Sequence, residues 1–362
     1  MSDLNPTGER RPAIRMETAA GASADLVREC APDFASAGIE RPIEVDQTNH
    51  SVVVDERAIV KWYVPPAPAP HRSITLARHL AEVGFAETPR LLGYRTDQGK
   101  VLATVTEFLP GARDGWDWLV HLFTDCADGI VTTEEVIEHA RAVGALGARL
   151  HHALTTPSTF VPEPVTIEAA DVEQQRSREL LDRALDTLST STDSAARRSL
   201  AEHRARIIQI IDAMPSGPTP VAPIHGDLHI GQILQVGEHL IVVDFDGNPL
   251  RTGDERDRPR PIAVDVASLI QSIDHAGRVA ARRRPDGSHD RLIEAATDAA
   301  LDVYRCSLAS VDIRHLLDDS MLPGLRVAQE LHEFVYAAEY LPHWTYAPIG
   351  ALRGLMRDER GI

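Results

Sequence analysis

Residues 224–234 read IHGDLHIGQIL, and residues 241–247 read IVVDFDG. The carboxylate of Asp244 follows three apolar residues of a predicted strand, a position that projects it rigidly from the end of a sheet. Gln232 lies five residues beyond Asp227, where a loop can bring the glutamine amide oxygen back toward a metal ion bound by these carboxylates. Two carboxylates and an amide thus gather in two short, turn-rich segments.

These residue types suit phosphoryl transfer. That reaction needs a carboxylate to orient the attacking hydroxyl, oxygen ligands for Mg²⁺ and a cation on the nucleotide phosphates. Asp227 and Asp244 can supply the first two roles. Because Mg²⁺ prefers hard oxygen ligands and takes few of them from protein, one carboxylate, the amide of Gln232 and phosphate oxygens form a sensible set.

Outward from these segments, strand patterns come first and helical patterns follow. Strands are predicted at 43–45, 51–54, 58–64, 91–94, 101–108, 233–235 and 240–243. Helices are predicted at 24–31, 73–83, 116–123, 133–154, 169–188, 195–214, 262–282, 290–307 and 325–340. Pro65–Pro70, with four prolines in six residues, is predicted as a loop. This order indicates an α+β, two-lobed fold.

The charge and composition of the chain exclude some classes of binding partner. The net charge of −17, from 54 acidic and 37 basic residues, would repel nucleic acid and anionic membrane, so we expect neither as a partner. No apolar run could span a bilayer and the N-terminus has no apolar core of a signal peptide, so we expect a cytoplasmic protein. Three scattered cysteines argue against a disulfide framework and a cysteine metal site.

Lysine is rare in this chain. Only Lys61 and Lys100 are lysines, and every other basic residue is arginine. Lys61 lies inside the apolar strand predicted at 58–64. A lysine kept in such a place calls for a specific explanation.

The two quoted segments resemble the catalytic and metal-binding loops of the aminoglycoside phosphotransferase and maltokinase group, relatives of the protein kinases. The resemblance implies a bilobal protein kinase-like fold. Its small β-rich N-terminal lobe would span residues 1–110, with a short N-terminal extension and a hinge at 106–110. Its larger helical C-terminal lobe would span 111–362 and carry the catalytic loop and the sugar site.

By this resemblance Asp227 orients or deprotonates the acceptor hydroxyl, while Gln232 and Asp244 hold Mg²⁺. Asp246, in place of the glycine of the kinase turn, would touch the metal or a water of its shell. The usual aminoglycoside kinase pattern has asparagine where Gln232 stands. Glutamine is typical of the maltokinase-like branch, which favours plain sugars over antibiotics as acceptors.

The resemblance also implies an ATP site. Lys61 would grip the α- and β-phosphates, and Asn49 and Ser51 would belong to a phosphate-covering loop. Glu107 and Leu109 would hold adenine through the backbone of the hinge.

The chain departs from the family pattern in one helix. The helix predicted at 73–83 has Thr75 where a glutamate partner for Lys61 is expected, and its only acid, Glu82, comes about two turns later. The partner of Lys61 is therefore open at this point.

The acceptor site is predicted near the C-terminus. Gln329 and Glu333 stand at helical spacing, and Trp344 follows a proline. Carboxylates and amides pair with sugar hydroxyls, an aromatic ring can lie under the sugar, and a carboxylate also suits an ammonium group. The segment resembles an actinobacterial maltokinase-like branch proposed as glucosamine kinases. That resemblance implies transfer to a glucosamine hydroxyl, at C6, with Asp227, His229, Gln329, Glu333 and Trp344 at the substrate.

Several alternatives stay open. His225 and His229 flank Asp227 in a pattern that a zinc hydrolase could also use, although no further ligands stand at readable spacings. Residues 329–344 could instead form a core helix. The acceptor could be maltose or an aminoglycoside, and a degenerate kinase fold could bind nucleotide without catalysis. We expect a monomer.

Overall fold

The computed structural model describes residues 20–34, 36–43, 49–169, 171–248, 253–285 and 289–357. The chain divides into two compact units, each described here by itself. Unit 1 comprises residues 1–113, 156–163 and 234–257. Unit 2 comprises residues 114–155, 164–233 and 258–362.

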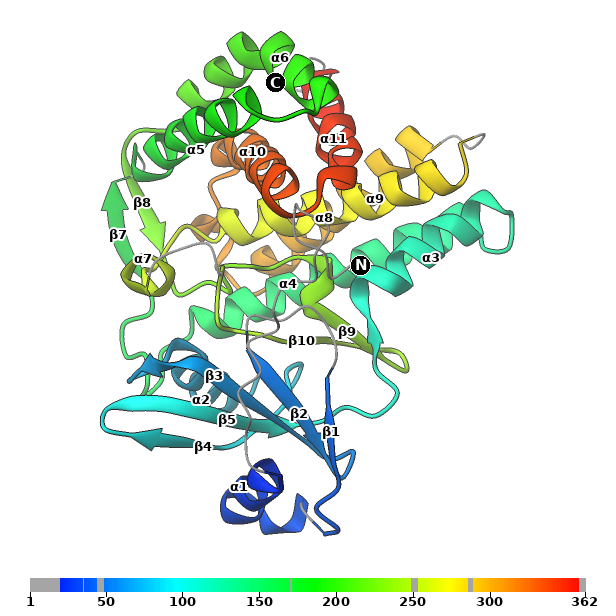
Figure 1. The fold of residues 1–362 in the computed structure, drawn as a ribbon. Helices are drawn as coiled ribbons and strands as arrows, with labels where there is room; N and C mark the ends of the chain where they lie inside the picture. The colour runs from blue at the N-terminus through cyan, green and yellow to red at the C-terminus, as the bar shows by residue number, and fades with distance from the viewer. Residues whose placement is uncertain are drawn as a thin grey trace. The chain divides into compact units, whose positions relative to one another are not determined.

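Unit 1 is built on an antiparallel sheet of order β1-β2-β3-β5-β4 (Figure 1). Its strands are β1 (Glu40–Pro42), β2 (His50–Val54), β3 (Ala58–Pro68), β4 (Leu91–Asp97) and β5 (Lys100–Glu107), and its helices are α1 (Ala22–Cys30), η1 (Pro32–Phe34), α2 (Arg72–Glu82) and α7 (Gly253–Asp257). A three-stranded sheet of order β10-β9-β6 contains β6 (Arg113–Asp114), β9 (Ile233–Val236) and β10 (His239–Val242).

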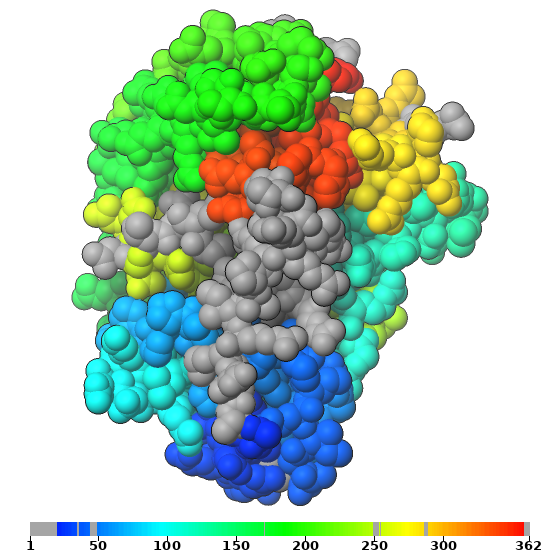
Figure 2. Space-filling view, in the orientation of Figure 1, coloured from blue at the N-terminus to red at the C-terminus, as the bar shows by residue number. Residues whose placement is uncertain are grey.

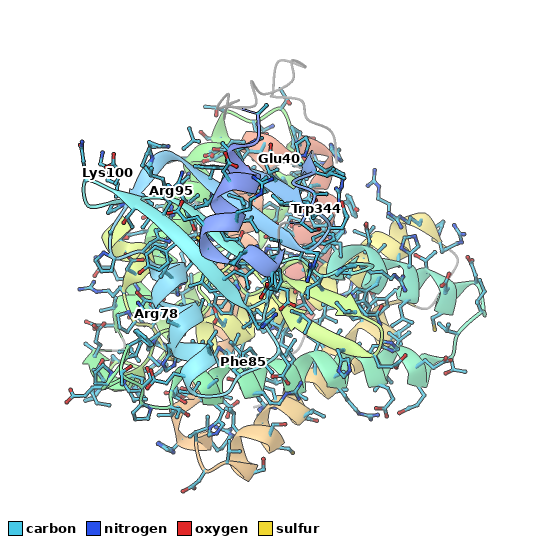
Figure 3. All side chains as sticks on the ribbon, turned by 90° about the horizontal axis from the view of Figure 1, so that it is seen from below. Glu40, Arg78, Phe85, Arg95, Lys100 and Trp344 are labelled. Atoms are coloured by element: carbon cyan, nitrogen blue, oxygen red, sulfur yellow. The ribbon has the colours of Figure 1, made fainter. Side chains whose placement is uncertain are left out.

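The two faces of the larger sheet bury different helices, because side chains alternate along a strand. Val60 and Trp62 of β3 pack in one apolar cluster with α1, whereas Tyr63 packs with Ile74 of α2 in another. Glu40, labelled in Figure 3, anchors α1 by accepting hydrogen bonds from the backbone N–H groups of Gly21 and Ala24 at the start of the helix. Lys61 shares the α2 face with Tyr63.

The prediction of a loop at Pro65–Pro70 is wrong for its first part, because β3 continues to Pro68. The register between β3 and β5 shifts between Trp62 and Ala67, so the first two prolines fall in the irregular stretch. Proline can occupy extended backbone where no ladder hydrogen bond needs its missing N–H.

Unit 2 is helical apart from a two-stranded sheet of β7 (Thr166–Ala169) and β8 (Pro218–Val221). Its elements are α3 (Gly115–Ala127), α4 (Thr133–Leu154), α5 (Asp171–Ser189), α6 (Ser194–Asp212), η2 (Ile230–Gln232), α8 (Ala263–Arg283), α9 (His289–Ser310), η3 (Arg314–Leu316), η4 (Asp319–Met321), α10 (Leu322–Tyr340), η5 (Pro342–Trp344) and α11 (Tyr346–Arg357). Thr132 and Glu135 start α4 with a capping box.

One apolar cluster of unit 2 joins α5, α6, α10 and α11, with Phe334 and Leu331 fully buried at its centre. Figure 2 shows α5 and α6, in green, lying against α10, in orange. The apolar side of α10 is thus buried in this cluster, while Gln329 and Glu333 remain partly exposed on its other side.

Candidate active site

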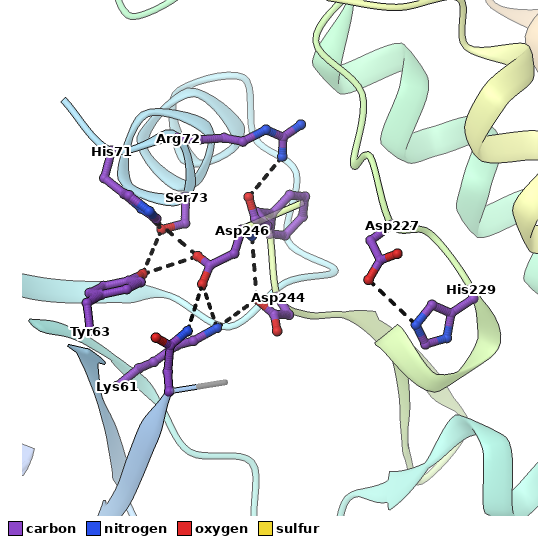
Figure 4. Close-up of polar contacts among 11 residues, drawn as sticks. Lys61, Tyr63, His71, Arg72, Ser73, Asp227, His229, Asp244 and Asp246 are labelled. Carbon is purple, nitrogen blue, oxygen red and sulfur yellow. Dashed lines mark hydrogen bonds and ion pairs between the residues drawn. The ribbon is translucent and has the colours of Figure 1, made fainter. Parts of the chain in front are cut away.

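In unit 1, Lys61 lies between two aspartates (Figure 4). Its Nζ is 2.8 Å from Asp244 Oδ1 and 2.8 Å from Asp246 Oδ2. Burial opposes the charge of this ammonium, but the two carboxylates outweigh burial and raise the pKa of Lys61. A permanent cation therefore stands in the sheet, next to Ser51 of β2 in the strand register.

Asp246 is the more enclosed of the two aspartates. Its carboxylate accepts hydrogen bonds from Tyr63 Oη at 3.2 Å and Asn49 Nδ2 at 3.5 Å. Burial would raise the pKa of Asp246, but Lys61 lowers it below its usual range. Burial and the charge of Asp246 raise the pKa of Tyr63 to about 12, so this phenol stays a donor.

The turn after β10 places Asp244 in left-handed backbone, with φ of 63°. Aspartate tolerates this conformation better than most residues. The carboxylate accepts from the N–H of Asp246 at 3.4 Å, and Arg72 of α2 donates to the carbonyl of Phe245 at 2.9 Å. The Asp244 side chain is 40% exposed, which leaves it accessible to a ligand.

The open question about Lys61 is answered within unit 1. Thr75, at the place of the expected glutamate, donates its hydroxyl to the carbonyl of His71. Glu82 accepts from the N–H and the hydroxyl of Thr159 at 2.9 and 2.6 Å. Neither helix residue reaches the lysine in the contacts described, and the aspartates after β10 take the role instead.

Of the predicted hinge residues, Glu107 is the last residue of β5 and Leu109 follows the strand. The carboxylate of Glu107 accepts from Arg90 Nε at 2.9 Å, and its N–H donates to the carbonyl of the same arginine. The carbonyl of Leu109 accepts from the N–H of Ala112 at 3.3 Å. Both the side chain and the N–H of Glu107 are thus engaged with Arg90, and a role for this residue through its backbone stays a prediction.

In unit 2, the loop that carries Asp227 is fixed by a carboxylate from α8. Asp265 accepts from the N–H groups of His225 and Gly226 at 2.6 and 2.9 Å, and from His151 Nε2 at 3.2 Å. Burial would raise the pKa of Asp265, which is 1% exposed, but the hydrogen bond from His151 and its neighbours lower it. Gly226 has a φ of 81°, which a side chain would strain.

Asp227 itself is partly buried, with His229 Nε2 at 3.9 Å from its Oδ2. Because His229 Nδ1 accepts from the N–H of Gly231 at 3.1 Å, its proton belongs on Nε2, the atom that faces Asp227. The backbone after it is held by Ser272, whose Oγ accepts from Ile230 N at 2.9 Å.

Gln232 closes η2, and its N–H donates to the carbonyl of His229 at 2.8 Å. Gln232 belongs to unit 2 and Asp244 to unit 1, so their joint action on one ion stays a prediction. Across the described part of the chain, no three His, Cys, Asp or Glu side chains gather as a closed metal site.

Three of the five predicted substrate residues, Gln329, Glu333 and Trp344, form one cluster in unit 2. Glu333 accepts from Gln329 Nε2 at 3.2 Å and from Trp344 Nε1 at 3.1 Å. The ring of Trp116 meets that of Trp344 edge-on, with 5.3 Å between centroids. A carboxylate thus lies beside partly exposed aromatic rings, an arrangement suited to a polar, cationic sugar.

Sequence reasoning missed three buried side chains that support these clusters: Asp265, His275 and Glu330. A charged residue inside an apolar helical pattern was the available signal, for Asp265 follows Ile262-Ala263-Val264 and Glu330 precedes Leu331. Such a residue does not identify its own role, because a single sequence does not reveal which distant group satisfies the charge.

A family model described as the phosphotransferase enzyme family matches residues 40–305. Two curated relatives are each named glucosamine kinase. The relative from Streptacidiphilus jiangxiensis is 39% identical over 97% of this chain and 81% of its own length. The relative from Mycolicibacterium smegmatis is 34% identical over 88% of this chain and 80% of its own length.

Solved structures give the same picture. A glucosamine kinase in complex with glucosamine, ADP and inorganic phosphate is similar, with a TM-score of 0.81, 34% identity, and coverage of 94% of this chain and 87% of that one. A crystal form of glucosamine kinase has a TM-score of 0.80 and 35% identity, covering 93% of this chain and 84% of that one. These likenesses confirm the predicted fold class. Among the described helices, none is long and apolar enough to cross a membrane.

Proposed function

Because the chain belongs to the phosphotransferase enzyme family, we propose that it is a kinase that transfers the γ-phosphoryl group of ATP to a hydroxyl of glucosamine, giving glucosamine 6-phosphate. The observation that carries the acceptor is the cluster of Gln329, Glu333 and Trp344, in a chain whose relatives are named glucosamine kinases. A carboxylate beside aromatic rings suits an ammonium-bearing sugar better than a neutral one.

The chemistry falls to Asp227. The acceptor oxygen forms a bond to the γ-phosphorus while the bond from that phosphorus to the oxygen of ADP breaks, and the hydroxyl proton passes to the Asp227 carboxylate. Asp265 keeps the loop in place, and His229 directs its Nε2–H toward Asp227. The protein takes little part in covalent chemistry, so the rate depends on how well it positions the acceptor hydroxyl against the γ-phosphate.

The residues present fit Mg²⁺. Asp244 and Asp246 already share one cation, the ammonium of Lys61, and hard carboxylate oxygens are the ligands that Mg²⁺ prefers. We assign Asp244 and the amide of Gln232 as ligands of Mg²⁺, which would neutralise charge on the phosphates.

We assign nucleotide binding to Lys61 on the phosphates, to Asn49 and Ser51 beside them, and to the backbone of Glu107 and Leu109 on adenine. Residues 1–110 would then serve as the nucleotide lobe and 111–362 as the acceptor lobe. A monomer acting in the cytoplasm completes the proposal.

Asp227→Asn tests the assignment. The amide keeps the shape of the side chain but cannot take a proton, so kcat should fall by about 10²–10⁴-fold while ATP binding is retained. Isothermal titration with ATP and a coupled assay for ADP release measure the two quantities. Asp186→Asn, at an exposed site on α5, is the matched control and should leave both unchanged.

The acceptor is tested on a panel of glucosamine, glucose, maltose and kanamycin. Glucosamine should give the highest kcat/KM. If glucose equals it, the pairing of ammonium with Glu333 is wrong. If no sugar stimulates ATP turnover, the chain is a nucleotide-binding protein rather than a kinase.

A further inference from the structure

Two ionisable side chains of unit 2 are buried without a part in the proposed chemistry. His275 of α8 is 4% exposed and Glu330 of α10 is 0% exposed. His275 Nε2 lies 3.1 and 3.0 Å from the two oxygens of Glu330. Such a buried pair is often no more stabilising than apolar side chains of similar size, so stability alone does not account for it.

The position of Glu330 is fixed from its other side. Gln271 Nε2 donates to Glu330 Oε1 at 2.5 Å, and Gln271 Oε1 accepts from Arg326 Nε at 2.5 Å. Since the arginine can only donate, it sets which way the amide points. Glu330 therefore has defined partners, and His275 completes them.

The imidazole leads from this core to the acceptor cluster. The ring of His275 meets that of Trp344 edge-on, with 6.0 Å between centroids and 82° between planes. Trp344 in turn donates its indole N–H to Glu333. A continuous path of contacts thus runs from Glu330 through His275 and Trp344 to Glu333.

The carboxylates along this path also favour the charged form of His275. Burial opposes protonation of His275, but Glu330 first, and then Glu333 and Asp274, raise the pKa of His275 to about 9. Asp274 is itself paired with Arg278 at 2.5 Å. His275 is therefore an imidazolium at neutral pH.

We propose that the His275–Glu330 ion pair is the positioning element of the acceptor site, which holds the Trp344 ring and, through the indole N–H, the carboxylate of Glu333. The inference rests on the proposed function, because that function assigns Glu333 and Trp344 to glucosamine. Neither member of the pair touches substrate. Both set the geometry of the groups that do.

Glu330→Gln tests the pair, since glutamine keeps an acceptor oxygen for Gln271 and His275 but removes the charge. We expect KM for glucosamine to rise about tenfold or more, with KM for ATP and kcat at saturating sugar unchanged. His275→Gln should have a similar effect. KM for glucosamine in the double variant should be no higher than in the more impaired of the two single variants, because the same interaction is lost in each.

Glu173→Gln is the matched control. Glu173 is 3% exposed and pairs with Arg260 at 2.6 Å, so its variant also breaks a buried ion pair of unit 2, one whose contacts as described involve no residue of the acceptor cluster. It should lower the melting temperature without changing KM for glucosamine. If Glu330→Gln behaves as this control does, the pair is structural and the inference is overturned.

A second measurement does not depend on activity. The chain has four tryptophans, and the indole ¹⁵N–¹H resonance of Trp344 can be assigned with Trp344→Phe. Glu330→Gln should shift or broaden this resonance, and Glu173→Gln should not. An unmoved resonance overturns the positioning role even if the protein phosphorylates another sugar, whereas a moved one in a protein inactive on glucosamine overturns only the proposed acceptor.

Discussion

The loop of Asp227 in unit 2 and the Lys61 cluster in unit 1 hold their charges in opposite ways. Asp265, beneath the loop, is 1% exposed and accepts from two backbone N–H groups. The side chains of Lys61 and Asp244 are 21% and 40% exposed and are bound by each other's charge. Backbone donors in a buried site cannot move away, whereas a flexible ammonium can exchange partners.

The difference separates what belongs to the fold from what belongs to the reaction. The position of Asp227 is part of the folded state, because releasing Asp265 would leave buried donors without acceptors. By the proposed function, the ion pairs of Lys61 can be replaced, because phosphate oxygens would compete for the ammonium and Mg²⁺ would compete for the aspartates. We therefore expect changes in the first region to alter stability, and changes in the second to alter nucleotide binding.

Asp265→Ala should have the largest effect. It removes the acceptor of two backbone N–H groups and of His151, which should lower the free energy of unfolding by about 3–5 kcal/mol and abolish turnover. Urea unfolding followed by circular dichroism measures the first quantity, and ADP release measures the second. Asp265→Asn should retain part of the stability, since one amide oxygen remains as an acceptor.

A stable Asp265→Ala protein with a normal kcat would contradict the first half of the comparison. It would mean that the loop keeps its shape without this carboxylate.

Lys61→Met should have a smaller and different effect. It should raise KM for ATP and lower kcat/KM by about 10–100-fold, with little change in the unfolding transition, because the two aspartates retain solvent and Mg²⁺ as partners. Steady-state kinetics at varied ATP measures this. Lys100→Met is the matched control, for this second lysine lies exposed at the start of β5, at the end of the β4–β5 hairpin (Figure 3).

Equal losses in the Lys61 and Lys100 variants would show that the ion pairs with Asp244 and Asp246 have no part in nucleotide binding. A large loss of stability in the Lys61 variant alone would show that the cluster belongs to the fold, as the Asp265 site does.

The sequence predicted groups that act within a short stretch. Asp227 and Gln232 stand in one loop, and Gln329 and Glu333 are one helical turn apart, so their relation is local. The isolated Lys61 was also recognisable, because a charged residue interrupts an apolar strand.

The partners of these groups were not predictable, because folding brings them from far along the chain. Asp265 lies 40 residues from His225, and Glu330 lies 55 residues from His275. Lys61 is 183 residues from Asp244, and the helix glutamate that family resemblance offered as its partner is absent. Local patterns give the chemistry of a side chain, whereas its support depends on tertiary packing that one sequence leaves open.

Unit 2 also contains a buried carboxylate that is held by arginine side chains, and its variant should have the smallest effect of those considered. Glu173 is as buried as Asp265 but is satisfied by arginine: burial would raise its pKa, and Arg260 and Arg176 lower the pKa of Glu173 to about 2 from 4.5. A lowered carboxyl pKa stabilises the fold fully above pH 4.5, and that stability is lost as the pH falls toward 2.

The free energy of unfolding of the wild type minus that of Glu173→Gln should therefore fall by about 1 kcal/mol between pH 7 and pH 3.5, since glutamine does not titrate. Urea unfolding of both proteins at each pH measures the difference. A difference that stays constant with pH would mean that the arginines do not hold Glu173 in its charged form. A difference that falls would show that side-chain cations hold this buried carboxylate in its charged form, as backbone N–H groups do for Asp265.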